Sequence, residues 1–208
     1  MEQVAIFGGT FDPVHWGHLL IAETALNQLE LDRVLWVPSP NPPHKLAAAF
    51  QHRCSMVELA ICDNPAFAIA PTQINYYGTS FAIDTLTELS TYYQDIHWYW
   101  IVGLDTFQTL PRWYRAKELV SLCDWLVAPR IGSYLTIEQS ESICQQVEQQ
   151  IRAESANIRW QLLNTPLVAV SSSLIRHLWQ EKKSIRYLVP EVVRRYIASH
   201  QLYKGNSE

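Results

Sequence analysis

Two histidines, His15 and His18, stand three residues apart near the start of the chain, with Gly17 between them. Residues three apart at the beginning of a helix share one face, so both imidazoles can point to one site. An imidazole N–H donates to a phosphate oxygen, and its ordinary pKa lies close to neutrality. Gly17 has no Cβ, which lets a bound group approach the backbone closely. The spacing favours a phosphate site over the alternative of two unrelated surface histidines.

A buried strand and a helix must hold these histidines. The apolar run 4–7 ends at Gly8 and Gly9, which is typical of a parallel strand that enters a tight turn. A helix is predicted from about Trp16 to residue 26. A glycine-rich turn that meets a helix N-terminus gathers free backbone N–H groups and the positive end of the helix dipole. Both features favour a bound anion at this point.

A second anion-binding pattern lies closer to the end of the chain. Three serines, 171–173, precede an apolar helical segment, and Arg176 follows within about its first turn. Serine is a common N-cap, and its hydroxyl adds to the free N–H groups of a helix start. The alternative is an ordinary serine cap beside a surface arginine. Pairing with the histidine motif favours an anion cradle that contains Ser172, Ser173 and Arg176.

Further candidates follow the ends of later predicted strands, where ligands collect in a doubly wound sheet. His44 and Lys45 lie in a proline-rich loop after the strand 33–38, and Arg130 follows the strand 125–128. An arginine that leaves a strand end is suited to phosphate. For His44 and Lys45 a solvated loop with incidental charge is the alternative.

The strand 96–102 is followed by Gly103 and Asp105. Asp105 is expected either to accept from ribose hydroxyls or adenine, or to cap the next helix together with Gln108. A short aromatic segment with Trp113 and Tyr114 comes next. A tryptophan near a strand end can stack on a flat heterocyclic ring, and core packing is the alternative.

Length and composition narrow the class of protein. The 208 residues suit one domain, and a formal net charge of −4 argues against a dedicated nucleic-acid binder. No apolar run has membrane-spanning length, and no signal-peptide pattern precedes the first strand. The four cysteines form no CxxC pair, so neither a zinc site nor a disulfide framework is expected. We expect a cytoplasmic protein.

The chain resembles the bacterial nicotinate-mononucleotide adenylyltransferases, which share an HxGH-type motif with a wider nucleotidyltransferase superfamily. Their GGTFDPxHxGH signature matches Gly8-Gly9-Thr10-Phe11-Asp12-Pro13-Val14-His15-Trp16-Gly17-His18. Their ISSTxIR-like motif is similar to VSSSLIR at residues 170–176, and the likeness extends from Phe7 to Tyr203. The resemblance implies an α/β fold: a Rossmann-like doubly wound parallel sheet with helices on both faces. We expect a single domain, 1–208, with a small C-terminal helical segment from about 171 packed on it.

The resemblance also implies transfer of AMP from ATP to nicotinate mononucleotide, with Mg²⁺ bound to the triphosphate. Catalytic roles are implied for His15, His18 and Arg176. The ATP contacts implied are Gly8, Gly9, Thr10, Phe11, Gly17, Gly103, Asp105, Ser172, Ser173 and Ile175. The contacts implied for the nucleotide acceptor are His44, Lys45, Phe81, Ala82, Trp113, Tyr114 and Arg130. Asp12 is expected to close its own turn rather than to bind the metal.

One segment departs from the family pattern. Relatives often carry Ser-Tyr-Thr where this chain has Ser80-Phe81-Ala82. That segment is similar to the one that meets the nicotinate carboxylate, partly through backbone N–H groups, and here two hydroxyls are lost. A missing hydrogen bond to a charged group costs roughly 1.5–3 kcal/mol, enough to weaken a preference about tenfold or more. The departure therefore leaves the choice between nicotinate and nicotinamide open.

Alternative functions follow from the same motifs. Nicotinamide mononucleotide or phosphopantetheine is an alternative acceptor, and a nucleotide sensor without turnover is a second class. A fragment of a class I tRNA synthetase fits poorly, because the chain is short, is not basic and has no KMSKS-like loop. We expect small-molecule substrates, no nucleic acid and no membrane partner. Assembly into a homo-oligomer is left open.

Overall fold

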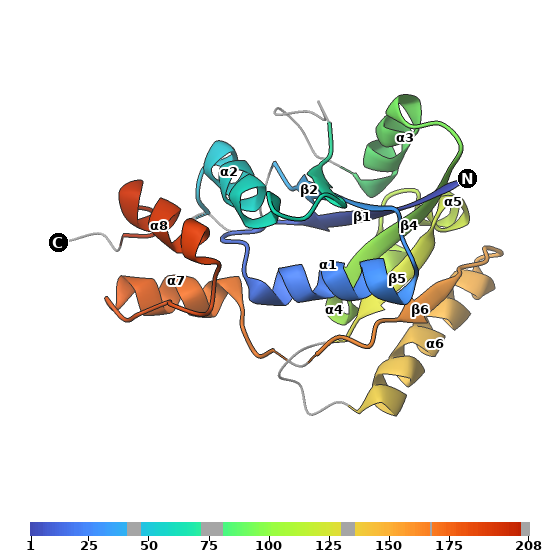
Figure 1. Cartoon of the computed structure of the whole chain (residues 1–208). Helices are drawn as coiled ribbons and strands as arrows, with labels where there is room; N and C mark the ends of the chain where they lie inside the picture. The colour runs from blue at the N-terminus through green and yellow to red at the C-terminus, as the bar shows by residue number, and fades with distance from the viewer. Residues whose placement is uncertain (41–46, 72–80, 130–135, 167, 205–208) are drawn as a thin grey trace.

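The structure, a computed structural model, describes residues 1–40, 47–71, 81–129, 136–166 and 168–204. In these residues six parallel strands form one sheet in the order β3-β2-β1-β4-β5-β6 (Figure 1). The strands are β1 (Glu2–Gly9), β2 (Arg33–Pro38), β3 (Phe67–Ile69), β4 (Ile96–Gly103), β5 (Asp124–Ala128) and β6 (Trp160–Leu162). The strand order reverses between β1 and β4, which makes the sheet doubly wound. The predicted α/β fold is confirmed.

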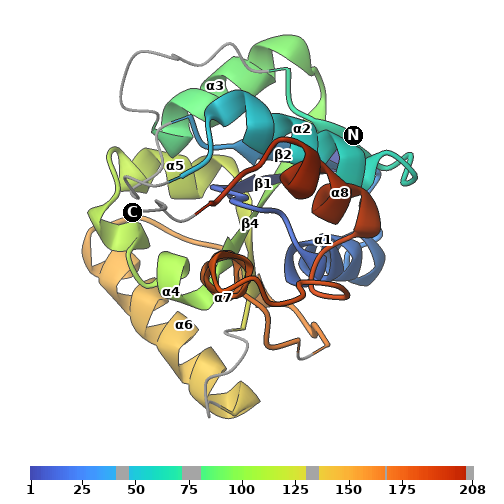
Figure 2. The ribbon, with the colours of Figure 1, turned by 90° about the vertical axis from the view of Figure 1, so that its left-hand side faces the viewer.

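Helices cover both faces of the sheet (Figures 1 and 2). One face carries α1 (Trp16–Gln28), α2 (Phe50–Ile61), α7 (Ser172–Gln180) and α8 (Glu191–Ser199). The other carries α3 (Ala82–Tyr92), α4 (Leu104–Phe107), the 3-10 turn η1 (Leu110–Arg112), α5 (Ala116–Leu122) and α6 (Ile137–Ala153). No helix in the described ranges combines the length and the apolar character that crossing a membrane requires.

The strands are buried on both sides, which explains their nearly continuous apolar runs. In β1, Ala5 and Phe7 pack toward the helices of the first face, whereas Val4 and Ile6 pack toward the second. A shift of one residue would exchange the two faces, so this alternation fixes the register of the strand. The register brings the glycines at the end of β1 to the carboxyl edge of the sheet.

The C-terminal helices lie beside the start of α1, at the left of Figure 1. Val193 and Ile197 of α8 are fully buried in the core that α1 and α2 share. The indole N–H of Trp179 in α7 donates to the carbonyl oxygen of Leu202 at 2.9 Å, which fastens the chain after α8 to α7. This segment therefore reaches the carboxyl edge of β1, where both predicted motifs lie.

A buried arginine, Arg53 on the first turn of α2, connects three segments at this edge. Its side chain is 1 % exposed and donates to the carbonyl oxygens of Ala48 at 3.1 Å, Thr10 at 2.7 Å and Pro40 at 3.4 Å. Burial lowers the pKa of this guanidinium, and the nearby Asp12 partly offsets the shift. Arg53 thus holds the loops after β1 and β2 against α2.

Replacing Arg53 by leucine removes these donors and leaves three partly buried carbonyl groups without their side-chain partner. We expect the free energy of unfolding to fall by about 3 kcal/mol or more. Urea unfolding of both proteins measures this loss. Arg33→Leu is the matched control, because Arg33 is half-exposed and lies 3.5 Å from Glu2. Its loss should stay below about 1 kcal/mol; equal losses in the two variants would contradict the role of Arg53.

Candidate active site

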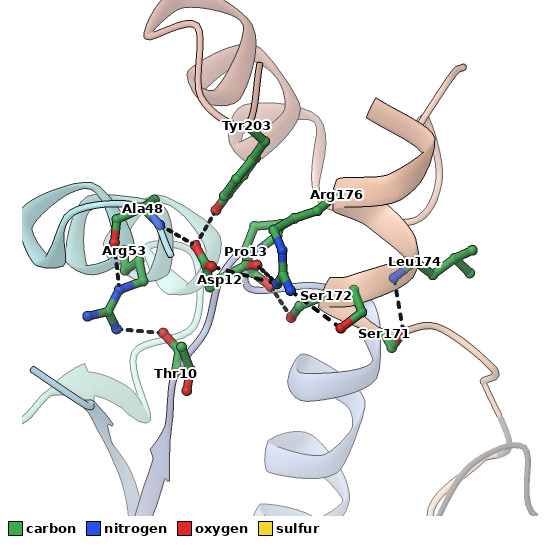
Figure 3. Close-up of polar contacts among 11 residues, drawn as sticks. Thr10, Asp12, Pro13, Ala48, Arg53, Ser171, Ser172, Leu174, Arg176 and Tyr203 are labelled. Carbon is green, nitrogen blue, oxygen red and sulfur yellow. Dashed lines mark hydrogen bonds and ion pairs between the residues drawn. The ribbon is translucent and has the colours of Figure 1, made fainter. Parts of the chain in front are cut away.

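The starts of α1 and α7 meet at the carboxyl edge of the sheet (Figure 3). The hydroxyl of Ser172 donates to the carbonyl oxygen of Pro13 at 2.9 Å. One guanidinium nitrogen of Arg176 donates to the carbonyl oxygen of Asp12 at 2.7 Å. The two motifs, more than 150 residues apart in the chain, therefore form one site, as the sequence analysis requires.

The two histidines stack on each other. The ring centroids of His15 and His18 are 3.7 Å apart with an interplanar angle of 25°. Nδ1 of His18 accepts the backbone N–H of His15 at 3.3 Å, so the neutral His18 ring carries its proton on Nε2. Nε2 is then the group of His18 that donates to a ligand.

Both imidazoles are neutral in the free protein at neutral pH. Burial lowers the pKa of His15 from 6.5 to about 4, against a smaller opposing effect of a backbone hydrogen bond. Burial also lowers the pKa of His18 well below 6.5, and the charge of a protonated His15 lowers it further. The pKa close to neutrality expected from the sequence is therefore wrong for both rings. A bound polyanion would raise both values, because an adjacent negative charge favours the imidazolium form.

Two glycines of the motif owe their place to the packing of neighbouring rings. A Cβ on Gly17 would lie 3.1 Å from the imidazole of His15 and 3.2 Å from the side chain of Val170. A Cβ on Gly9 would lie 2.8 Å from the ring of Phe11. These glycines let the rings of the loop pack closely, whereas the sequence analysis assigns the missing Cβ to the approach of a ligand.

Two residues expected at the ATP site have side chains in the core. Phe11 is 2 % exposed, and the centroid of its ring lies 5.1 Å from that of His18. The two rings pack edge to face, so Phe11 supports the histidine through a core contact. Ile175 is fully buried, and its N–H donates to the carbonyl oxygen of Ser171 at 3.0 Å. We therefore give Ile175 a packing role. Phe11 can offer a ligand only its backbone, which has a φ of 50°.

The three serines have different roles. Ser171 is the N-cap of α7, and its hydroxyl accepts the N–H of Leu174 at 3.2 Å. The hydroxyl of Ser172 donates to Pro13 in the loop 10–15 between β1 and α1, which we call the histidine loop. The hydroxyl of Ser173 accepts from Arg176 at 3.4 Å. Of the three serines that are candidates for the N-cap, Ser171 is therefore the cap. Because the N–H of Leu174 is bonded to Ser171, the other N–H groups of the first turn are the helix donors left for an anion.

Asp12 lies in the turn after β1, and its side chain connects that turn to three other segments. It is 1 % exposed, and Oδ1 accepts the N–H of Ala48 at 3.1 Å and the phenol O–H of Tyr203 at 2.7 Å. Oδ2 lies 3.6 Å from the guanidinium of Arg176. Burial and the nearby carboxylate raise the pKa of the Tyr203 phenol, so this group stays a donor. No local sequence signal points to Tyr203.

A cavity of about 540 Å³ opens beside this site, at the carboxyl ends of β1, β2 and β4. From this side the cavity is lined by Gly8 and Gly9 at the end of β1 and by Thr10 in the histidine loop. The neighbouring strands contribute Val37 and Val102. This is the point where the strand order reverses, the usual ligand position in a doubly wound sheet. The loop therefore borders the cavity and the stacked histidines alike.

The predicted acceptor residues Phe81, Ala82, Trp113 and Tyr114 all line the cavity. The rings of Phe81 and Tyr114 lie 4.5 Å apart, and both residues are partly exposed. The indole N–H of Trp113 donates to the hydroxyl of Thr109 at 2.9 Å, which leaves the ring face as its ligand surface. These aromatic groups fit a flat ring better than a polar chain.

Gly103 and Asp105 lie at the adjoining edge of β4. The structure has Gly103 as the N-cap of α4, so Asp105 lies inside the first turn. The predicted cap by Asp105 with Gln108 is therefore wrong, and the ligand-binding alternative stays a prediction. A Cβ on Gly103 would meet nothing within 4 Å, so the space beside it is open. His44, Lys45 and Arg130 lie outside the described residues.

Sequence reasoning also misses residues of the site that carry no motif. Arg112 and Trp100 line the cavity. Arg53 holds the histidine loop through its hydrogen bond to the carbonyl oxygen of Thr10. Arg112 ends η1 and is separated from the end of β4 by α4, so the strand-end signal used above for Arg130 does not point to it. The buried role of Arg53 has no such signal either.

Comparisons with known proteins identify the family of this chain. A family described as Cytidylyltransferase-like matches residues 6–178. Proteins of Trichormus variabilis and Nostoc sp., each named "probable nicotinate-nucleotide adenylyltransferase", are 62% identical over 100% of this chain and 100% of their own length. The chain belongs to the nicotinate-nucleotide adenylyltransferase family. The family that the sequence motifs indicate is thereby confirmed.

More distant members of the family keep the same length. A Synechococcus sp. protein of the same name is 43% identical over 97% of this chain and 95% of its own. Two solved structures of Plasmodium falciparum nicotinic acid mononucleotide adenylyltransferase, complexed with APC and with NaAD, superpose with TM-scores of 0.76 and 0.77. They cover 98% of both chains at 17% and 18% identity, a likeness that shows the fold.

The buried histidine pair predicts a specific titration. Since the folded pKa of His15 is about 4 and the unfolded value is 6.5, the unfolded chain binds more protons between these values. The stability that this neutral ring contributes is complete above pH 6.5 and is lost as pH falls toward 4. NMR titration of the imidazole Cε1–H, assigned with His15→Gln, should give a midpoint near 4 that rises when ATP binds. A midpoint near 6.5, the value expected in urea, would contradict the burial of the ring.

Proposed function

We propose that this protein transfers the AMP moiety of ATP to nicotinate mononucleotide and releases pyrophosphate. Family membership supports the reaction, and the acceptor cavity beside the histidines supports its location. The observation that carries the proposal is the 2.7 Å hydrogen bond from Arg176 to the carbonyl oxygen of Asp12. It joins the start of α7 to the histidine loop and so gives one triphosphate two sets of donors.

The reaction requires the two substrates to be positioned and does not require covalent catalysis. An oxygen of the acceptor's 5′-phosphate attacks the α-phosphorus of ATP in line, and the bond to the α–β bridging oxygen breaks. Pyrophosphate leaves with the electron pair. The nucleophile is already an anion, so no general base and no covalent intermediate are required. Electrostatic stabilisation of the phosphates is the main task of the protein.

Three kinds of donor would share that task. Nε2–H of His18 donates without the cost of a buried charge in the free enzyme. The guanidinium of Arg176, 19% exposed, supplies a permanent positive charge. Backbone donors would come from the first turn of α7, at a helix start. Further backbone donors would come from Gly8 and Gly9, at the end of β1.

The acceptor would lie in the cavity, with its pyridine ring against Trp113 and the pair Phe81 and Tyr114. Thr10 borders both this cavity and the histidine loop, so the acceptor's phosphate would face the triphosphate. His44, Lys45 and Arg130 stay in the proposal as further phosphate contacts. Gly103 and Asp105 stay in it as ATP contacts.

Mg²⁺ enters the reaction as part of the substrate, bound to the triphosphate. In the described residues no group of three or more His, Cys, Asp or Glu side chains is arranged to hold a metal. Asp12 does not fit a metal ligand, because Oδ1 already accepts two hydrogen bonds and Oδ2 lies 3.6 Å from Arg176. Phosphate oxygens and water would therefore coordinate the ion, which neutralises charge on the phosphates.

One residue change favours a second acceptor. Phe81 and Ala82 bring no hydroxyl to the cavity, so a neutral nicotinamide ring loses less there than a nicotinate carboxylate does. Nicotinamide mononucleotide is thus the second candidate substrate. A single domain spanning 1–208 and a cytoplasmic location complete the proposal; the location is supported by four cysteines that are all free thiols.

Pyrophosphate release tests the proposal directly. The purified protein with ATP and Mg²⁺ should release pyrophosphate with nicotinate mononucleotide and more slowly with nicotinamide mononucleotide. Phosphopantetheine should give no release above the rate without acceptor. Binding of ATP without release on any acceptor would contradict the proposal and indicate a sensor.

The same assay tests the histidines. His18→Ala should lower kcat by about 10²-fold, the scale for loss of one preorganised donor. His97→Ala is the matched control, because His97 pairs with Asp124 at 3.1 Å near the amino end of β4, whereas the cavity lies at the carboxyl ends of the strands. Its kcat should match that of the unaltered enzyme. Equal activity in both variants would remove His18 from the mechanism.

A further inference from the structure

One cation lies among the residues of the acceptor cavity. Of the described residues that line it, Arg112 alone has a charged side chain; the others are apolar, glycine or neutral hydroxyl-bearing residues. Arg112 ends η1, directly before Trp113, and its side chain is exposed. Among the described lining residues, this positive charge favours an anionic ligand over a neutral one.

Several neutral side-chain donors near the aromatic wall are occupied or missing. The indole N–H of Trp113 is spent on Thr109, and the hydroxyl of Thr85 donates to the carbonyl oxygen of Phe81 at 3.3 Å. Phe81 and Ala82 have no side-chain donor. The neutral side-chain groups that remain in the described lining are hydroxyls, such as that of Tyr114, and they bring no positive charge to a carboxylate.

Arg112 is available for that purpose. In the described part of the chain its guanidinium takes part in no ion pair. Arg115, three residues further along the chain, is a useful comparison. Arg115 is engaged with Glu118 through two hydrogen bonds of 2.9 Å and 2.6 Å. The two arginines are thus close in sequence and differ in what they can offer a ligand.

We propose that Arg112 is the residue that selects an acidic pyridine nucleotide over its amide. This inference rests on the proposed function and names the source of its substrate preference. A guanidinium presents parallel N–H groups that match both oxygens of a carboxylate, and the attraction is between full charges. A carboxamide is neutral and offers one acceptor oxygen, so it gains much less.

The test is the ratio of kcat/KM for nicotinate mononucleotide to kcat/KM for nicotinamide mononucleotide. Arg112→Gln should lower this ratio by about tenfold or more, mainly through KM for the acid, because a charge-assisted contact is lost. Arg112→Lys should restore part of the ratio, since it keeps the charge without the planar fork. Arg115→Gln is the matched control and should leave the ratio unchanged.

Each outcome separates this inference from the proposed function. If the unaltered enzyme releases pyrophosphate with neither nucleotide, the proposed function fails. If it prefers the acid and Arg112→Gln keeps the same ratio, only the role of Arg112 fails. Equal losses on both substrates would mean that Arg112 binds the 5′-phosphate they share, which also overturns the inference.

Discussion

The buried carboxylate of Asp12 is the interaction on which the site depends. It binds the backbone of Ala48 and the phenol of Tyr203, and it lies 3.6 Å from Arg176. These partners come from the start of α2, the end of the chain and α7. Because a buried carboxylate is costly unless it is paired and hydrogen-bonded, each partner has an energetic reason to stay. The loop after β1 is thereby held against the start of α7.

Neutral histidines follow from the same compact arrangement. Aromatic rings packed against the loop and the stacking of His15 on His18 limit the access of water to the imidazoles, and His15 is 6% exposed. The free enzyme thus holds one arginine and two neutral N–H donors rather than three positive charges. A triphosphate that binds would supply the negative charge that favours protonation, so charge on the histidines would follow the ligand. The acceptor cavity lies just beyond this loop and carries its own arginine.

The fold and the meeting of the two helix starts were predictable from the sequence, because apolar runs, glycines and N-cap serines are local signals. The contact between Asp12 and Tyr203 was not, since the two residues are 191 positions apart and a phenol in a chain end has no local signature. The roles of Gly9 and Gly17 were also missed. Sequence shows that a Cβ is absent, but only the packing of Phe11 and His15 shows what fills the space. The depressed histidine pKa values depend on burial, which spacing alone does not report.

The most direct measurement is a crystal structure of the protein with an ATP analogue whose α–β bridge is not cleavable. If the account is right, phosphate oxygens of one analogue molecule lie within hydrogen-bond distance of an imidazole of His15 or His18. The same triphosphate also contacts Arg176 or a first-turn N–H group of α7. A triphosphate that contacts only one of the two helix starts, with the other facing solvent, would contradict the account.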